Sequence, residues 1–439
     1  MKARLVPLYF KSGMDDDYGR QLNNLRGLLA AEAEILEPVA LGSPIPDADG
    51  VVFPQLLGDA YSQLAELKAI DVPLVIITSE FGTMSMWDWE IDAYLRSHGM
   101  RTLAPHNLDM AKGICRTLAL KRDLKQTKFL VFQDNPGKGF QADIFKRFYW
   151  WEKECSDLIN DRFGVSIVKR GYRALAGAAR EISDAEAEAV QRERRIPSEG
   201  VSPRALNSAL KLYLAVKLEM EGDAGIKGVG INCLNESHFC DTTPCLAWNL
   251  LYEEAGTIWA CEADVMVLLT KYLLQKSLGA QIMMTNLYPF LMGMAALKHE
   301  RIPGFPEVAD PDDHLLAAHC GYFGVVPQSF STDWTLRPKV LAIVDDNATA
   351  IDARVPVGDI TLAKLHPMLT RIAVVKGSLE GYVQYPGSDC RNGAIIRIPD
   401  GHKFLSTIYS HHYLIVTGDR HVEIEMLARV FDLQAEDVQ

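Results

Sequence analysis

Two carboxylates interrupt an otherwise apolar stretch of the chain, "GTIWACEADVMVLL" at residues 256–269. Burying a carboxylate is costly unless the group is paired, hydrogen-bonded or bound to a metal ion. The pattern predicts a strand over residues 257–261 and a helix over residues 265–279. Asp264 therefore suits the N-cap of this helix, whereas Glu262 has no such local role. If the backbone stays extended between them, both side chains lie on one side and can converge on one point.

A third acidic residue follows another predicted strand. The run "GVGINCL" at residues 228–234 leads into Asn235 and Glu236. Side chains at strand ends of α/β sheets project into the crevice where ligands bind, so Glu236 is a candidate catalytic group, with a surface-loop residue as the equal alternative. Asp241 fits better as the N-cap of a helix that begins near Pro244.

Histidines occur in two further motifs. His319 follows a small apolar run in "HLLAAHCGYFG", and His411 and His412 open the strand-like run "HHYLIVTGD". Adjacent residues on a strand face opposite ways, so at most one of this pair points at a given site. A lone histidine is more often structural than functional, so spacing alone does not make His319 a ligand.

The cysteines narrow the choice of metal. The chain has 8 cysteines and no CxxC pair. This usage predicts free, mostly buried thiols in a reducing compartment, and no cysteine cluster. The remaining carboxylates and imidazoles suit a divalent ion like Mn²⁺ better than a structural zinc ion.

The elements that must position these residues fall into two patterns. Strand-like runs and amphipathic helices alternate through the first part of the chain, including one long helix predicted over residues 140–164, and this favours parallel sheets covered by helices. Short strands with frequent Pro and Gly follow, which indicates an antiparallel barrel or sandwich. We therefore expect an α/β chain with a domain at 1–125, a second at 126–300 with the acidic residues, and a β-rich domain at 301–439 with the histidines.

Length and charge exclude some functions. The chain has 439 residues, enough for two or three domains, and a net charge of −12. This charge argues against a general nucleic-acid binder, since affinity for phosphates needs clustered Lys and Arg. The sequence has no apolar run of membrane-spanning length and no signal peptide at its start, so we expect a cytoplasmic protein with no membrane partner.

From residue 228 onward, the order of motifs resembles the L-fucose isomerase and L-arabinose isomerase superfamily, in particular its shorter fucose-isomerase-like branch. The most specific parts are "CEAD" before a long apolar helix and "HHYLIVTGD" before another helix. Before residue 228 the likeness is only architectural. The resemblance implies two Rossmann-like parallel α/β domains, a C-terminal antiparallel β-barrel, and a homo-oligomer. It also implies an aldose–ketose isomerase that uses Mn²⁺ on a monosaccharide, a pentose or deoxyhexose, through an enediol.

The resemblance also implies roles for individual residues. It assigns metal binding to the acidic pair Glu262 and Asp264 together with His319 and His412. The catalytic acids are Glu236, Glu262 and Asp264, and which of them is the base and which a ligand stays open.

One motif departs from the family. Where arabinose isomerases carry a further glutamate ligand, this chain reads "MMTNLYP", which offers Thr285 and Asn286. Two alternatives therefore stay open. The first is a non-catalytic sugar-binding or regulatory homologue, and the second is a metal-dependent enzyme that catalyses another reaction on a sugar, such as epimerisation or carbon–carbon cleavage.

Overall fold

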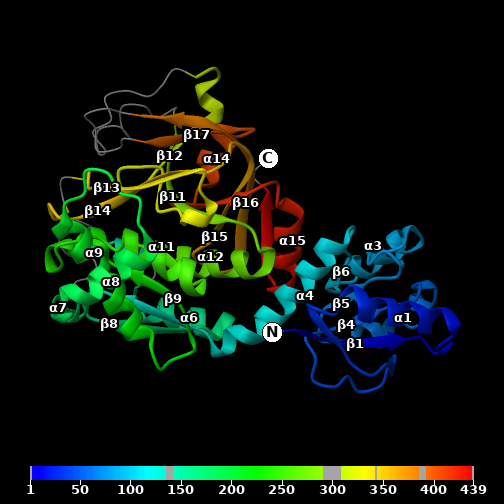
Figure 1. Ribbon diagram of the computed structural model, residues 1–439. Coiled ribbons are helices and arrows are strands. Elements are labelled where there is room, and N and C mark those ends of the chain that lie inside the picture. The colour runs from blue at the N-terminus through cyan, green and yellow to red at the C-terminus, as the bar shows by residue number, and fades with distance from the viewer. Residues whose placement is uncertain are drawn as a thin grey trace. The chain divides into compact units, whose positions relative to one another are not determined.

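The computed structural model describes residues 2–134, 142–149, 151–289, 308–341, 344–384 and 392–437. The chain divides into two compact units. Figure 1 colours the ribbon by residue number, so the segments of each unit can be located in it. Unit 1 contains Met1–Lys125, Leu273–Gly279 and Val422–Ala435, and unit 2 contains Gln126–Tyr272, Ala280–His421 and Glu436–Gln439. The predicted boundary between residues 300 and 301 lies outside the described residues, so the predicted division into three domains stays a prediction.

Unit 1 is built on a parallel 6-stranded sheet in the order β2-β1-β4-β5-β6, with β3 beside β1. Its strands are β1 (Ala3–Tyr9), β2 (Ala33–Ile35), β3 (Val39–Ala40), β4 (Gly50–Phe53), β5 (Leu74–Ile76) and β6 (Thr102–Leu103). Its helices are α1 (Asp16–Leu28), α2 (Leu64–Lys68), α3 (Trp89–Ser97) and α4 (Leu108–Asp123). The predicted alternation of strands and helices is confirmed here, and the Rossmann-like classification stays a prediction.

Unit 2 contains a second parallel sheet, in the order β10-β9-β7-β8. Its strands are β7 (Lys128–Phe132), β8 (Ser166–Arg170), β9 (Ile226–Ile231) and β10 (Ile258–Cys261). Besides two helices between β7 and β8 that are described below, its helices are α7 (Tyr172–Glu181), α8 (Asp184–Arg194), α9 (Pro203–Met220), α10 (Cys233–Glu236), α11 (Cys245–Ala255) and α12 (Val265–Leu278). The last residues of α12, from Leu273, belong to unit 1. β10 and most of β9 are buried, as expected for parallel strands covered on both faces.

The single helix predicted over residues 140–164 is wrong. The described part of this stretch forms α5 (Phe145–Phe148) and α6 (Lys153–Phe163), while residues 140, 141 and 150 lie outside the described residues. Between the two helices, Tyr149 and Trp151 are buried and donate hydrogen bonds to the segment that follows β10. These contacts with a distant segment outweigh the local preference for one continuous helix.

A closed antiparallel barrel follows in unit 2. In the described residues its strands run in the order β15-β18-β11-β12-β17-β16, and β16 pairs back with β15. They are β11 (Ile282–Pro289), β12 (His314–Ala318), β15 (Gly358–Leu365), β16 (Arg371–Val383), β17 (Gly393–Arg397) and β18 (His412–Thr417). The barrel, rather than a sandwich, is therefore confirmed, and its first strand precedes residue 301.

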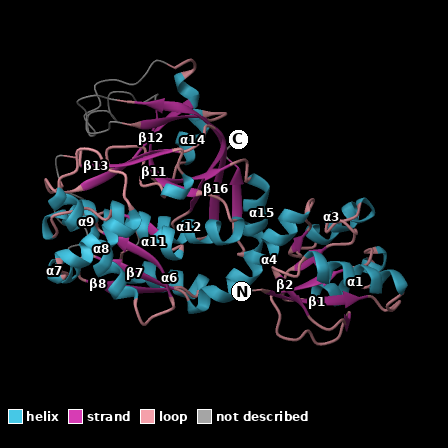
Figure 2. Cartoon of the chain, in the orientation of Figure 1, coloured by secondary structure: helices cyan, strands magenta, loops and turns pink. Residues whose placement is uncertain are grey.

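The remaining elements complete the fold, and the colours of Figure 2 distinguish the strands of the barrel from the helices around the parallel sheet of unit 2. They are the antiparallel pair β13 (Asp333–Pro338) and β14 (Thr349–Arg354), α14 (Gly401–Thr407), α15 (His421–Val430) and β19 (Gln434–Asp437). Within the described ranges, no helix has both the length and the apolar character needed to cross a membrane.

Candidate functional site

The acidic pair lies on a strained turn between β10 and α12. Glu262 and Ala263 have φ angles of 57° and 55°, in the left-handed region. The expectation of an extended backbone between the two acids was therefore wrong. Such a conformation costs about 1–3 kcal/mol for each non-glycine residue and is found preferentially at functional sites.

Neighbouring segments hold this turn in place. The indole Nε1 of Trp151 donates to the carbonyl of Ala263 at 2.7 Å, and the carbonyl of Tyr149 accepts from the amide of Val265 at 3.1 Å. On the adjacent strand β9, a Cβ at Gly230 would lie 3.2 Å from the Ala263 Cα, so glycine permits the close approach. The strained residues are thus fixed by packing from two other segments.

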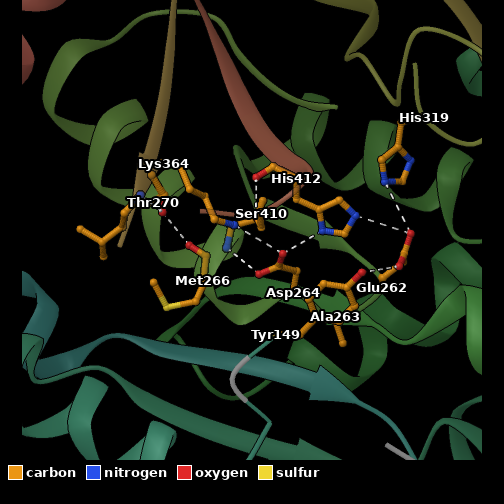
Figure 3. A network of polar contacts seen from close by, with 12 residues as sticks. Tyr149, Glu262, Ala263, Asp264, Met266, Thr270, His319, Lys364, Ser410 and His412 are labelled. Carbon is orange, nitrogen blue, oxygen red and sulfur yellow. Dashed lines mark hydrogen bonds and ion pairs between the residues drawn. The ribbon is translucent and has the colours of Figure 1, made fainter. Parts of the chain in front are cut away.

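Three side chains converge beyond this turn, as Figure 3 shows. The Oε1 atom of Glu262 lies 3.8 Å from His319 Nε2 and 3.7 Å from His412 Nε2. Both distances are too long for hydrogen bonds, and neither buried Nε2 atom has a hydrogen-bond partner among the described residues. Ligand atoms about 2.0–2.2 Å from one ion lie up to about 4.4 Å apart, so the spacing of these groups fits a shared divalent ion.

Asp264 lies behind His412, outside this group of three. Its Oδ1 accepts from the amide of Val267 at 2.9 Å, which confirms the predicted N-cap. Its Oδ2 lies 2.8 Å from His412 Nδ1 and 3.5 Å from the Nζ atom of Lys364. Ligating histidines usually donate their second ring N–H to such a carboxylate. Asp264 is therefore placed to orient His412, with Nε2 directed at Glu262, and its assignment as a metal ligand stays a prediction.

Two residues of this network were not predicted from the sequence. The hydroxyl of Tyr149 donates to Glu262 Oε2 at 2.9 Å, and its ring stacks on His412 at 5.1 Å between centroids. Lys364 lies on β15 with its side chain buried. A period-two pattern with Ile360 and Leu362 could have marked Lys364 as inward-facing, whereas no local signal marks Tyr149.

Glu236 follows β9 in a different conformation from the one predicted. The strand ends at Ile231, and Glu236 closes the helical turn α10. Its carboxylate is fully buried and accepts from the amide of Asp134 at 2.8 and 2.9 Å and from Asn232 Nδ2 at 3.0 Å. Because β9 and β10 are parallel neighbours, Glu236 and Glu262, which come after them, lie at the same edge of the sheet. Glu236 is not a member of the group formed by Glu262, His319 and His412.

The N-cap predicted for Asp241 is wrong. The N-cap position of α11 is Pro244, which makes no side-chain capping bond, and Asp241 Oδ2 accepts from the hydroxyl of Ser208 at 3.0 Å instead. The predicted alternation of the histidine pair is confirmed, because His411 is exposed and His412 is fully buried.

Thr285 and Asn286, which stand where arabinose isomerases carry a further glutamate ligand, lie on the strand beside His412. In the barrel, Asn286 is directly opposite His412 on one side and Ala318 on the other. Directly opposed residues share a face of the sheet, so Asn286 extends toward the same side as His412. Its Oδ1 is buried without a hydrogen-bond partner in the described part of the chain. The hydroxyl of Thr285, in contrast, is already hydrogen-bonded: it donates to the carbonyl of Phe323 at 3.2 Å.

The prediction of no cysteine cluster is also wrong. Cys261, the last residue of β10, and Cys320, which follows His319, form a second group with that histidine, in which the possible ligand atoms lie within 4.8 Å of one another. Spacing rules could not reveal this group, because its two cysteines lie far apart in the chain.

The charges of the site follow from burial and mutual contact. Burial by itself raises the pKa of Glu262, but His412, then His319 and His411, outweigh it and lower this pKa to about 2. Burial lowers the pKa of His319 to about 4, against the attraction of Glu262. Burial also lowers the pKa of His412, but Asp264 and Glu262 outweigh it and raise this pKa above the usual value. His412 is thus protonated more readily than an ordinary histidine, because two carboxylates face it.

The affinity for a divalent ion should therefore fall as the pH decreases through the pKa of His412. A histidine must be neutral to bind a metal, whereas Glu262 stays ionised above about pH 2 and His319 stays neutral above about pH 4. At pH values below the pKa of His412, the binding of each ion should release one proton. Calorimetry in buffers of different ionisation enthalpy measures this number, and release of two protons, or of none, would contradict the assignment.

Comparisons with protein-family models and with curated proteins find no match for this chain.

Proposed function

We propose that this protein is a divalent-metal-dependent aldose–ketose isomerase that acts on a pentose or deoxyhexose, with Mn²⁺ as the ion. The observation that carries the proposal is the convergence of Glu262 Oε1 with two buried imidazole nitrogens that have no hydrogen-bond partner among the described residues. A carboxylate with two imidazoles is a donor set that suits a divalent metal. The resemblance of the motifs to the fucose and arabinose isomerases supports the reaction class.

Each residue of the network has a distinct role in this proposal. Glu262, His319 and His412 would hold the ion. When bound, the ion supplies electrostatic stabilisation of the negative charge that develops on the sugar oxygens. Asp264 fixes the tautomer of His412, and Tyr149 holds Glu262 Oε2 by its hydroxyl proton. Asn286 offers an amide oxygen on the same face of the barrel as His412.

The proton transfer between the two carbons requires a further group. A pKa of about 2 makes Glu262 a weak base at neutral pH, which suits a metal ligand better. Asp264 contacts His412 and Lys364, and in this proposal it orients the ligand His412 instead of transferring the proton. We therefore assign the proton transfer to Glu236, the remaining candidate acid at this edge of the sheet.

Glu236→Gln should separate turnover from metal binding. The amide keeps the size of the side chain and removes its basicity, so turnover should fall by a factor of about 10²–10⁴. The affinity for Mn²⁺, measured by calorimetry, should stay within a few-fold of wild type. If metal binding and turnover are lost together, Glu236 is a ligand or a structural residue; if turnover is unchanged, it has no role in proton transfer.

The proposed function is tested on purified protein with two measurements. The first is the metal content, before and after exposure to Mn²⁺. The second is product analysis by NMR in D₂O with a panel of pentoses and deoxyhexoses, since isomerisation through an exchangeable enediol places deuterium at C1 or C2 of the product. Protein that binds no Mn²⁺ and converts no sugar would favour a non-catalytic sugar-binding protein. Inverted or cleaved products would instead identify an epimerase or a lyase.

A further inference from the structure

Three separate elements bring thiols together on the far side of the His319 ring. Cys261 ends β10, Cys320 follows β12, and Cys245 begins α11. The Sγ atom of Cys320 lies 2.8 Å from His319 Nδ1. The possible ligand atoms of Cys261, His319 and Cys320 lie within 4.8 Å of one another, and the Cys245 thiol interacts with that of Cys320. This thiol cluster (Cys245, Cys261, Cys320 and the Nδ1 side of His319) has no part in the proposed isomerase reaction.

We propose that the thiol cluster is a second metal site, which takes a thiophilic ion of the Zn²⁺ class. Cys261 Sγ, Cys320 Sγ and His319 Nδ1 would be three ligands, and Cys245, which lies outside that group of three but interacts with Cys320, would be the fourth. Three thiolates and one imidazole are an established tetrahedral donor set for zinc. With Zn–S distances of about 2.3 Å, the sulfurs of such a site lie roughly 3.8 Å apart, which agrees with possible ligand atoms that lie within 4.8 Å of one another.

The thiol cluster is accessible to an ion from solvent. Cys245 and Cys261 are buried, whereas Cys320 is partly exposed and gives the cluster an opening to solvent.

The two proposed metal sites share the ring of His319. Its Nε2 atom faces Glu262 and its Nδ1 atom contacts Cys320. A neutral imidazole has one lone pair, so it can serve only one ion unless it loses its N–H proton. A thiophilic ion in the cluster should therefore weaken Mn²⁺ binding at the Glu262 site. The thiol cluster itself goes beyond the proposed function and does not depend on it.

Co²⁺ provides a test that needs no enzyme activity. Reduced, metal-free protein titrated with Co²⁺ should develop the near-ultraviolet charge-transfer absorption of thiolate-bound cobalt. The absorption should persist in Glu262→Gln, which disables only the first site. It should be lost in the double variant Cys261→Ser/Cys320→Ser and kept in the control Cys115→Ser, a buried cysteine of unit 1. No absorption in wild type, or absorption that survives in the double variant, would overturn the proposal.

A second measurement on wild-type protein keeps the test decisive if the double variant does not fold. Zn²⁺ should slow alkylation of Cys320 and its cluster partners, located by mass spectrometry, and leave the labelling of Cys155 and Cys240 unchanged. Equal labelling of Cys320 with and without Zn²⁺ would overturn the thiol cluster as a metal site. It would leave the Mn²⁺ proposal intact, because that proposal rests on Glu262 and on the opposite ring nitrogen of His319.

Discussion

Glu262→Gln should nearly abolish turnover, with a loss of at least about 10²–10⁴-fold, and should remove tight binding of Mn²⁺. Glu262 is the only anionic member of the group of three, so the substitution removes the charge that attracts the ion. It also replaces one of the two oxygens by an amide N–H₂, which cannot bind a metal. Oε1 faces both imidazoles and Oε2 accepts from Tyr149, so either orientation of the amide disrupts the network.

The measurements for this variant are kcat on the sugar identified by NMR and the Mn²⁺ affinity by calorimetry. Glu188→Gln is a matched control, because this exposed glutamate on α8 pairs only with Arg192 among the ion pairs of the described residues. The control should match wild type in both measurements. A Glu262→Gln protein with near-normal activity would exclude Glu262 from the site and the proposed function with it.

The parts of the fold set by local chemistry were predictable from the sequence. Alternating apolar runs identified both parallel sheets and the barrel strands, since side-chain period and strand length are local properties. The N-cap at Asp264 was predicted because the bond to Val267 spans three residues. The helix over residues 140–164 was predicted wrongly because Tyr149 contacts Glu262, 113 residues away.

The site itself was only partly predictable, because several of its contacts join residues that are far apart in the sequence. The apolar surroundings singled out Glu262 and the family resemblance pointed to His319 and His412, and the structure brings these three together. The place of Asp264 depends on a contact with His412, 148 residues away, which no local pattern reports. The thiol cluster was missed because spacing rules detect cysteines that are close in sequence, and these thiols come from three separate elements.

Asp264→Asn should destabilise the protein by about 3–5 kcal/mol and lower the affinity for Mn²⁺ by at least about 10–100-fold. The amide oxygen can still cap α12 by accepting from Val267. The amide N–H₂ then faces His412, which donates toward Asp264, and the Lys364 ammonium, which forms an ion pair with it. The buried Lys364 loses its counter-charge. His412 must accept at Nδ1, which moves its proton to Nε2 and blocks the lone pair that would bind the ion.

These two effects separate in a double variant. Asp264→Asn/Lys364→Met removes the stranded ammonium and should recover most of the stability in denaturant unfolding. It should not recover Mn²⁺ affinity, because His412 keeps the wrong tautomer. Asp92→Asn is the control, since this buried acid of α3 pairs with Arg96 at 3.0 Å and lies outside the site; it should leave Mn²⁺ binding unchanged. If the double variant bound Mn²⁺ as tightly as wild type, Asp264 would have no role in orienting His412, and its contribution would be only to the pairing of Lys364.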